Sequence, residues 1–161
     1  MAIIGGIFGY IKFTEQPSPE EEKAALGYVE EAFNDPDAPL TENEKFKALY
    51  PDSLDEYTVQ NKIHNMSHQK VQAEEKWGHE QITKPKVDRL LEVVKANETN
   101  YEHEATYIKI LERWADGDFS NAVEDHNAVW KLQEGTIGEA YRLMSPVEEW
   151  RYIQQYFLDK E

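Results

Sequence analysis

The chain has 161 residues, with 32 acidic and 17 basic side chains and a formal net charge of −15 at pH 7. A nucleic-acid-binding protein needs a concentrated basic patch to neutralise phosphates, so this charge predicts no nucleic-acid partner. Cysteine is absent, which excludes disulfides, thiolate metal sites and cysteine nucleophiles. The length suits one domain with a sizeable core, and we expect no cofactor.

The first 13 residues, MAIIGGIFGYIKF, form an apolar segment. It is shorter than the roughly 20 residues that a membrane-spanning helix needs. We interpret it as the outer end of a membrane anchor, with an apolar strand or helix docked on the domain as the alternative. Residues 14–18 are then a polar linker, and residues 19–161 an acidic helical domain. This interpretation predicts an extracytoplasmic domain at the cell membrane, and the alternative is a cytoplasmic protein.

Capping residues and apolar spacing predict the helices in chain order. Ser18 with Pro19 and Glu21 is a helix-start signature for a helix over about 19–33. A second capping box begins a short helix over about 41–50. A third begins a long helix, from about residue 53 to Trp77, which Gly78 would end.

Four more helical patterns follow, over about 85–96, 101–115, 119–132 and 147–157. The glycine-containing connection 133–144 predicts at most one helical turn, and no stretch alternates as a half-buried strand does. The predicted fold class is all-α. We expect a single domain of about six to seven helices in an irregular bundle, because the local signals agree with one another.

The stretch IHNMSHQKVQAEEKWGHE, residues 63–80, holds three of the five histidines. On the predicted long helix, His64 and His68 are one turn apart and face the same way, as two ligands of one metal ion must. They are the candidate metal ligands, and a polar surface without metal is the alternative. Because they lie opposite an apolar stripe, that polar face would be exposed to solvent or lie at a second interface. The stripe consists of Val59, Ile63, Met66, Ala73 and Trp77.

Two of the other three histidines are interpreted as structural. His126 and His103 lie among apolar residues of their own helices, which predicts buried, hydrogen-bonded side chains. His79 comes just after Gly78 and is expected to be exposed. No catalytic residue is assigned, because the chain contains no nucleophile elbow, phosphate-binding glycine loop or dinucleotide fingerprint.

Three segments carry a resemblance to known sequences: IHNMSHQKVQAEEKWG, YIKILERWADGDFSNAVEDHNAVW and GTIGEAYRLMSPVEE. Together they resemble an uncharacterised family of Bacillus-type proteins, a domain of unknown function, over about residues 55–155. The resemblance implies a short exported or membrane-anchored helical protein. It implies no activity, cofactor or site residue.

Three functions are compatible with these patterns. The first is a non-enzymatic interaction domain of a bacterial envelope protein, which offers acidic and aromatic surfaces to an unidentified protein partner. The second is a small helical-bundle metal-binding protein or metalloenzyme that uses His64 and His68. The third is a cytosolic acidic inhibitor or immunity protein. The aromatic residues considered for a partner are Trp150, Tyr152, Tyr156 and Phe157, which packing on the core would also explain.

Overall fold

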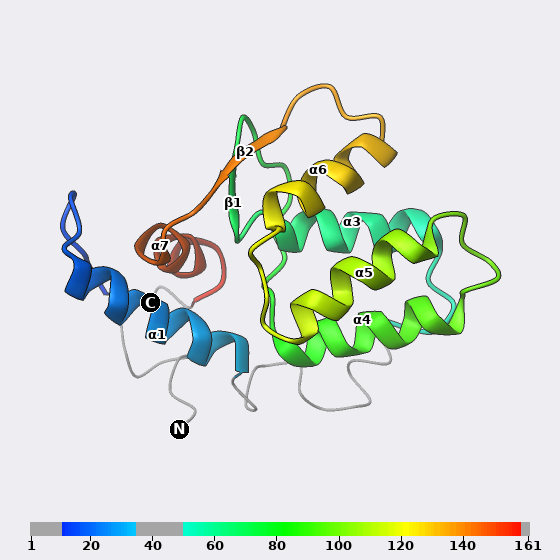
Figure 1. Cartoon of the computed structure of the whole chain (residues 1–161), viewed down its shortest axis with the longest axis horizontal. Helices are drawn as coiled ribbons and strands as arrows, with labels where there is room; N and C mark the ends of the chain where they lie inside the picture. Colours follow the sequence, from blue (N-terminus) through cyan, green and yellow to red (C-terminus); the bar gives the residue numbers. More distant parts are fainter. Residues whose placement is uncertain (1–10, 35–49, 159–161) are drawn as a thin grey trace.

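The computed structural model describes residues 11–34 and 50–158 (Figure 1). In chain order the elements are α1 (Pro19–Asn34), α3 (Glu56–Ser67), β1 (Val71–Ala73), α4 (Lys84–Ala96), α5 (Glu104–Ala115), α6 (Ala122–Leu132), β2 (Ala140–Leu143) and α7 (Pro146–Tyr156). The predicted helical class is confirmed: the described part is a mostly helical single domain with six helices. The helix predicted over about 41–50 lies almost wholly outside the described residues.

Local capping fixes where α1 and α7 begin. The Ser145 hydroxyl accepts a hydrogen bond from the Glu148 amide at 3.2 Å, and the Glu148 carboxylate accepts one from the Ser145 amide at 2.9 Å. Ser18 and Glu21 make the same reciprocal pair, at 3.1 and 3.3 Å. These bonds satisfy amide groups that have no partner within the helix, so both predicted starts are confirmed.

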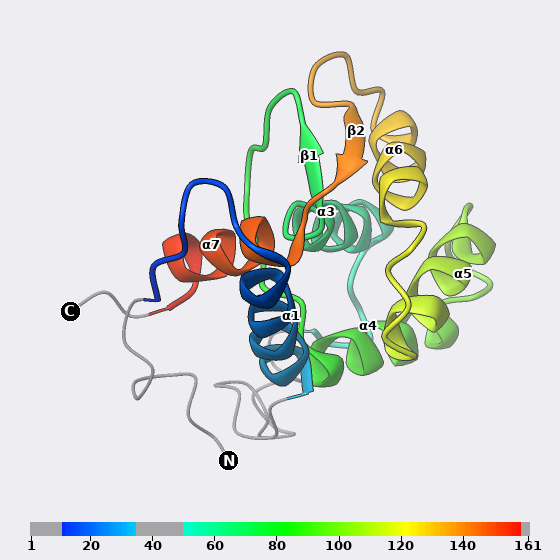
Figure 2. The same ribbon diagram turned by 60° about the vertical axis from the view of Figure 1, so that its left-hand side comes forward.

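The helices pack as three pairs, which are visible in two views (Figures 1 and 2). Helix α4 lies against α5, α1 lies against α7, and α3 lies against α6. A small antiparallel sheet of β1 and β2 lies between the α3–α6 pair and α7. Its register pairs Val71 with Leu143 and Gln72 with Arg142.

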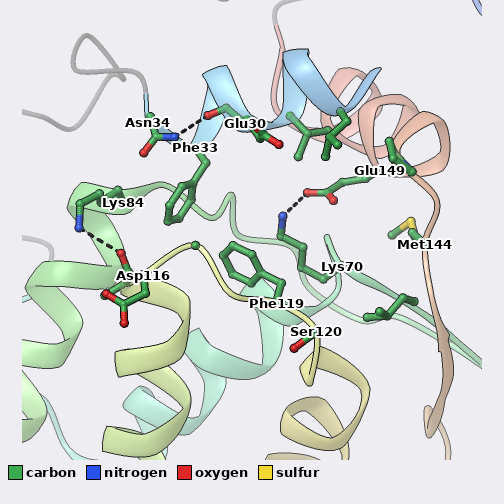
Figure 3. Close-up of a pocket in the computed structure, with 16 residues that line it drawn as sticks. Glu30, Phe33, Asn34, Lys70, Lys84, Asp116, Phe119, Ser120, Met144 and Glu149 are labelled. Atoms are coloured by element: carbon green, nitrogen blue, oxygen red, sulfur yellow. Dashed lines mark hydrogen bonds and ion pairs between the residues drawn. The ribbon is translucent and has the colours of Figure 1, made fainter. Parts of the chain in front are cut away.

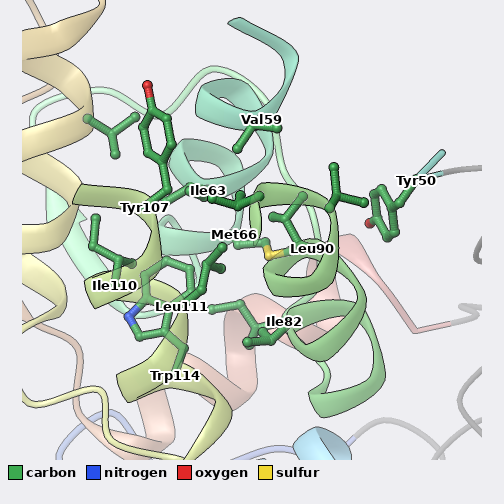
Figure 4. Close-up of a cluster of buried hydrophobic side chains, with 14 of the residues drawn as sticks. Tyr50, Val59, Ile63, Met66, Ile82, Leu90, Tyr107, Ile110, Leu111 and Trp114 are labelled. Carbon is green, nitrogen blue, oxygen red and sulfur yellow. The ribbon is translucent and has the colours of Figure 1, made fainter. Parts of the chain in front are cut away.

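The main hydrophobic core lies between α3, α4 and α5 (Figure 4). Burying each large apolar side chain contributes roughly 1.5–3 kcal/mol to folding. Two large aromatic residues at this core also have a polar partner: Trp114 donates from its ring nitrogen to Asp125 at 3.1 Å, and the Tyr107 hydroxyl donates to Glu56 at 2.6 Å. The labelled core includes Tyr50, Val59, Ile63, Met66, Ile82, Leu90, Ile110 and Leu111.

A second cluster joins α1 to α7 and receives the chain that precedes α1. Ile11 and Phe13 pack against it, and the buried Gln154 side chain bonds both the amide and the carbonyl of Ile11, at 2.5 and 2.8 Å. The described end of the apolar N-terminal segment therefore contacts the domain. Within residues 11–34 and 50–158, no helix is long and apolar enough to cross a membrane. Residues 1–10 lie outside the described part, so the membrane anchor stays a prediction.

The prediction that the long helix reaches Trp77 is wrong, because α3 ends at Ser67. After it the chain forms β1, where Val71 is fully buried, and the Lys70 carbonyl accepts a hydrogen bond from the Met144 amide at 2.9 Å. Pairing with β2 thus outweighs the helical propensity of residues 68–77. As a consequence Trp77 leaves the apolar stripe and is 74% exposed, whereas Val59, Ile63 and Met66 are buried as predicted.

Candidate metal site

Three histidine side chains meet where α3 packs on α6. His64 and His68 come from the end of α3, and His126 comes from the middle of α6. The ring centroids are 4.8 Å apart for His64 and His68, 4.7 Å for His64 and His126, and 5.3 Å for His68 and His126. One nitrogen of each ring lies within 4.8 Å of the others. The two histidines that the sequence analysis paired thus face one another, and His126 completes the group.

The group is buried, so the polar face lies at a second interface and is not exposed to solvent. His68 is 1% exposed, His126 is fully buried as predicted, and His64 is half-buried. The side of α3 that carries the histidines faces away from the main core, as expected. That side is nevertheless covered, because α6 packs against it.

Hydrogen bonds fix the tautomer of all three rings. His68 Nδ1 lies 2.7 Å from the Gly78 carbonyl, and His126 Nε2 lies 2.9 Å from the Gly138 carbonyl. A carbonyl oxygen only accepts, so each of these nitrogens carries its proton and donates. His64 Nδ1 likewise donates to the side-chain oxygen of Gln133 at 2.7 Å. The Gln133 amide nitrogen donates to Asn61 at 2.8 Å, which orients the glutamine for this role.

Each neutral ring therefore keeps one lone pair for another partner. These are Nε2 of His64, Nε2 of His68 and Nδ1 of His126. His126 Nδ1 lies 2.8 Å from the Ser67 hydroxyl, which also lies 2.5 Å from the His64 carbonyl. In this tautomer Nδ1 of His126 only accepts, so the single Ser67 proton serves either that nitrogen or the His64 carbonyl. A metal ion at Nδ1 would require Ser67 to donate to the carbonyl. A histidine that donates one N–H to a carbonyl or amide oxygen and presents its other nitrogen has the orientation of a metal ligand.

The electrostatics keep the rings neutral. Burial lowers the pKa of His68 to about 3 and that of His126 to about 4, and burial also lowers the pKa of His64. The positive charge of Lys76 contributes a smaller lowering for His68 and His126. Neutral imidazole is the form that binds metal ions, so no proton has to be displaced at neutral pH.

Two glycines present the carbonyls that hold the rings. Gly78 has φ +96° and Gly138 has φ +109°, a region of backbone conformation that favours glycine. A Cβ at Gly138 would lie 3.1 Å from the Glu75 carbonyl, and one at Gly78 would lie 2.7 Å from the Asn65 side chain. From the sequence, Gly78 was predicted only as a helix stop, and Gly138 had no predicted role.

We expect Gly138→Ala to destabilise the protein by about 1–3 kcal/mol, because alanine at this φ is strained and crowds the Glu75 carbonyl. Gly27→Ala is the matched control: Gly27 lies inside α1, and a Cβ there would meet no atom within 4 Å, so alanine should stabilise by up to about 1 kcal/mol. Urea denaturation of both variants measures the difference. Equal effects of the two changes would contradict a backbone role for Gly138.

The remaining histidines lie apart from this group. His79 is half-buried rather than exposed, because its ring stacks on Tyr156 at 3.7 Å and its Nδ1 bonds the Tyr152 hydroxyl. His103 precedes α5, and its side chain is 39% exposed, so its predicted burial is wrong.

A separate cavity of about 590 Å³ lies beside α1 and the loop between α5 and α6 (Figure 3). Phe33 and Phe119 line it, together with a buried ion pair in which Lys70 Nζ lies 2.7 Å from a Glu149 oxygen. Lys84, also in the lining, already donates to the Ala115 carbonyl at 3.1 Å. None of the three clustered histidines lines this cavity, so the two sites are distinct.

The fold and the site together define a small, mostly helical domain with a buried cluster of three histidines. The chain belongs to the family of unknown function DUF6241, which matches residues 63–154, more than half of its length. The match includes the three histidines, both carbonyl-presenting glycines and Gln133. No curated protein and no solved structure matches the chain.

Proposed function

We propose that this domain binds one zinc ion, or a similar transition-metal ion, through His64, His68 and His126. The observation that carries the proposal is the shared orientation of the three rings. Each ring donates one nitrogen to a protein oxygen, and the three rings are close enough that one nitrogen of each lies within 4.8 Å of the others. Hydrogen bonding explains one nitrogen each of His64 and His68, and both nitrogens of His126 through Gly138 and Ser67. A common metal ion would explain the second nitrogen of His64 and His68 and would replace Ser67 at His126.

The spacing of the rings fits such an ion after a small closure. Zinc binds imidazole at ~2.0–2.1 Å, so tetrahedral ligand nitrogens lie roughly 3.4 Å apart. The three nitrogens would therefore approach one another by about 1 Å or slightly more. His64 is half-buried, which leaves its side chain room for this movement. Three protein ligands leave a fourth position for water or another ligand.

The donor set selects a class of ion. Three imidazoles suit zinc, copper, nickel, cobalt or iron, whereas calcium and magnesium prefer oxygen ligands. The positive charge of Lys76 would repel a bound cation. Its ammonium donates to the His68 carbonyl at 2.8 Å, and its charge lowers the pKa of both His68 and His126. Burial lowers the pKa of Lys76 to about 8, so this charge is lost readily when a metal ion arrives.

Calorimetric titration of the untagged protein with zinc chloride, and with magnesium chloride as a comparison, tests the proposal. We expect one equivalent of zinc to bind and magnesium to give no signal. A ligand that binds only the folded state stabilises it, by about 2.7 kcal/mol at a free concentration one hundred times Kd. The melting temperature should therefore rise with zinc. Cobalt should give the visible absorption of a tetrahedral nitrogen site.

His64→Ala is the key variant, because His64 is the least buried of the three and its loss leaves most of the core intact. It should abolish both the calorimetric signal and the thermal shift. His103→Ala is the matched control, since its side chain is partly exposed at the start of α5, and it should bind zinc as the parent does. Absence of stoichiometric zinc from the parent, or equal zinc binding by His64→Ala, would refute the proposal.

A further inference from the structure

Two neighbouring loops carry large apolar side chains on the surface. Residues 74–80 follow β1, and residues 133–139 precede β2. Trp77 in the first loop is 74% exposed, and Ile137 in the second is 51% exposed. Each directly precedes a glycine whose carbonyl holds a buried histidine. We call the exposed large apolar and acidic side chains of these two linked loops the Trp77–Ile137 patch. They are Trp77, Ile137 and the glutamates Glu74, Glu75, Glu134 and Glu139.

Hydrogen bonds fix the two loops to each other and to α6. The Glu74 amide donates to the Glu139 carbonyl at 3.2 Å, which ties the two loops to each other. The Trp130 ring nitrogen donates to the Ile137 carbonyl at 3.0 Å and ties the second loop to α6. A preorganised surface loses little conformational entropy when a partner binds. An exposed tryptophan on such a surface is the side-chain type that contributes most to protein interfaces.

Apart from Lys76, every charged residue in the two loops is acidic. The four glutamates of the patch form no ion pair within the described residues. Lys76, the basic residue of the first loop, is turned inward: its ammonium donates to the His68 carbonyl and lies 4.7 Å from the Tyr152 ring centre. Arg142, beside the second loop, forms a two-bond pair with Glu148, at 2.7 and 2.9 Å. The glutamates therefore face solvent without a compensating cation from either residue.

We infer that the Trp77–Ile137 patch docks a basic amphipathic segment of a protein partner, one that places an apolar side chain between lysines or arginines. The apolar pair supplies contact area, and the surrounding carboxylates attract a partner of positive charge and repel an acidic one. This inference does not depend on the proposed zinc site, because none of the six residues of the patch is among the proposed ligands.

A direct test uses a fluorescein-labelled peptide of alternating leucine and lysine and follows its anisotropy with the full-length protein. A lysine–serine peptide of equal charge and a leucine–serine peptide without charge serve as comparison probes. We expect the leucine–lysine peptide to bind most tightly, with an affinity that falls as salt is added, because charge complementarity is screened by salt. Equal binding of the uncharged peptide would overturn the inference.

Matched variants locate the contact. Trp77→Ser combined with Ile137→Ser should weaken leucine–lysine binding at least about tenfold, whereas Tyr57→Ser, which changes another exposed aromatic residue, should leave it unchanged. Glu→Gln at the four patch positions should weaken binding more than the same change at Glu15, Glu20, Glu98 and Glu124, which are also exposed. Equal effects within either comparison would overturn the inference. Self-association that the Trp77→Ser, Ile137→Ser variant abolishes would also overturn it, because a second copy would then be the occupant.

Discussion

Replacing Glu149 with alanine is expected to lower the free energy of unfolding by about 3–5 kcal/mol, because it leaves the ammonium of Lys70 buried without its counter-charge. The two side chains are 8% and 9% exposed and 2.7 Å apart. Glu149 also accepts a hydrogen bond from Gln69 at 2.9 Å, so the change leaves the Gln69 side-chain amide without this acceptor as well. The ammonium also lies over the Phe119 ring, whose centre is 4.0 Å away. A cation–π contact, worth roughly 0.5–2 kcal/mol, does not replace a buried ion pair.

Urea denaturation of Glu149→Ala and of two comparison variants gives the measurement. Arg142→Ala breaks the half-exposed pair between Arg142 and Glu148 and should cost under about 1 kcal/mol. Lys70→Met combined with Glu149→Leu removes both charges and keeps apolar volume, so it should recover most of the loss. A cost under about 1 kcal/mol for Glu149→Ala would show that solvent reaches Lys70 and would contradict the buried ion pair.

The starts of α1 and α7 were the most predictable part of the fold. Helix α3 begins at Glu56, capped by Asp55, and not at the capping box predicted near residue 53. Ser18 with Glu21, and Ser145 with Glu148, are signals contained in four consecutive residues, and the structure forms both through the same local hydrogen bonds. The end of α3 was not predictable in this way. Residues 68–77 have good helix propensity, and what stops the helix is pairing with a strand that begins at Ala140. Strands of three and four residues give no alternating pattern long enough to detect.

The candidate metal site was likewise predictable only in part from the sequence. The spacing of His64 and His68 showed that they share a helix face, because four residues make one turn. The third member was not identifiable, since His126 reaches them only through the packing of α6 on α3. Its burial was predicted correctly from its apolar neighbours, but burial alone indicated a structural role.

Acidification from about pH 6.5 to about pH 4.5 is expected to destabilise the metal-free protein by about 2–3 kcal/mol for each of His68 and His126. Burial lowers the folded-state pKa of His68 to about 3 and that of His126 to about 4, from an ordinary value of 6.5. Between these values and 6.5 the unfolded chain binds protons that the folded protein excludes. Stability is therefore fully present above about pH 6.5 and is lost as the pH falls through this window.

Urea denaturation at a series of pH values measures this dependence. His68→Gln removes one titrating ring, so the variant should lose less stability between pH 6.5 and 4.5 than the parent does, by about 2–3 kcal/mol, whatever its stability at neutral pH. Glu148 does not contribute to the pH dependence within this window. Its hydrogen bond with Arg142 lowers its pKa to about 2, so the stability that Glu148 contributes is lost only as the pH falls below its ordinary pKa of 4.5. Parallel pH profiles for the parent and His68→Gln would mean that His68 is hydrated in the folded protein, and a dry three-histidine cluster would then be the wrong description of the interface between α3 and α6.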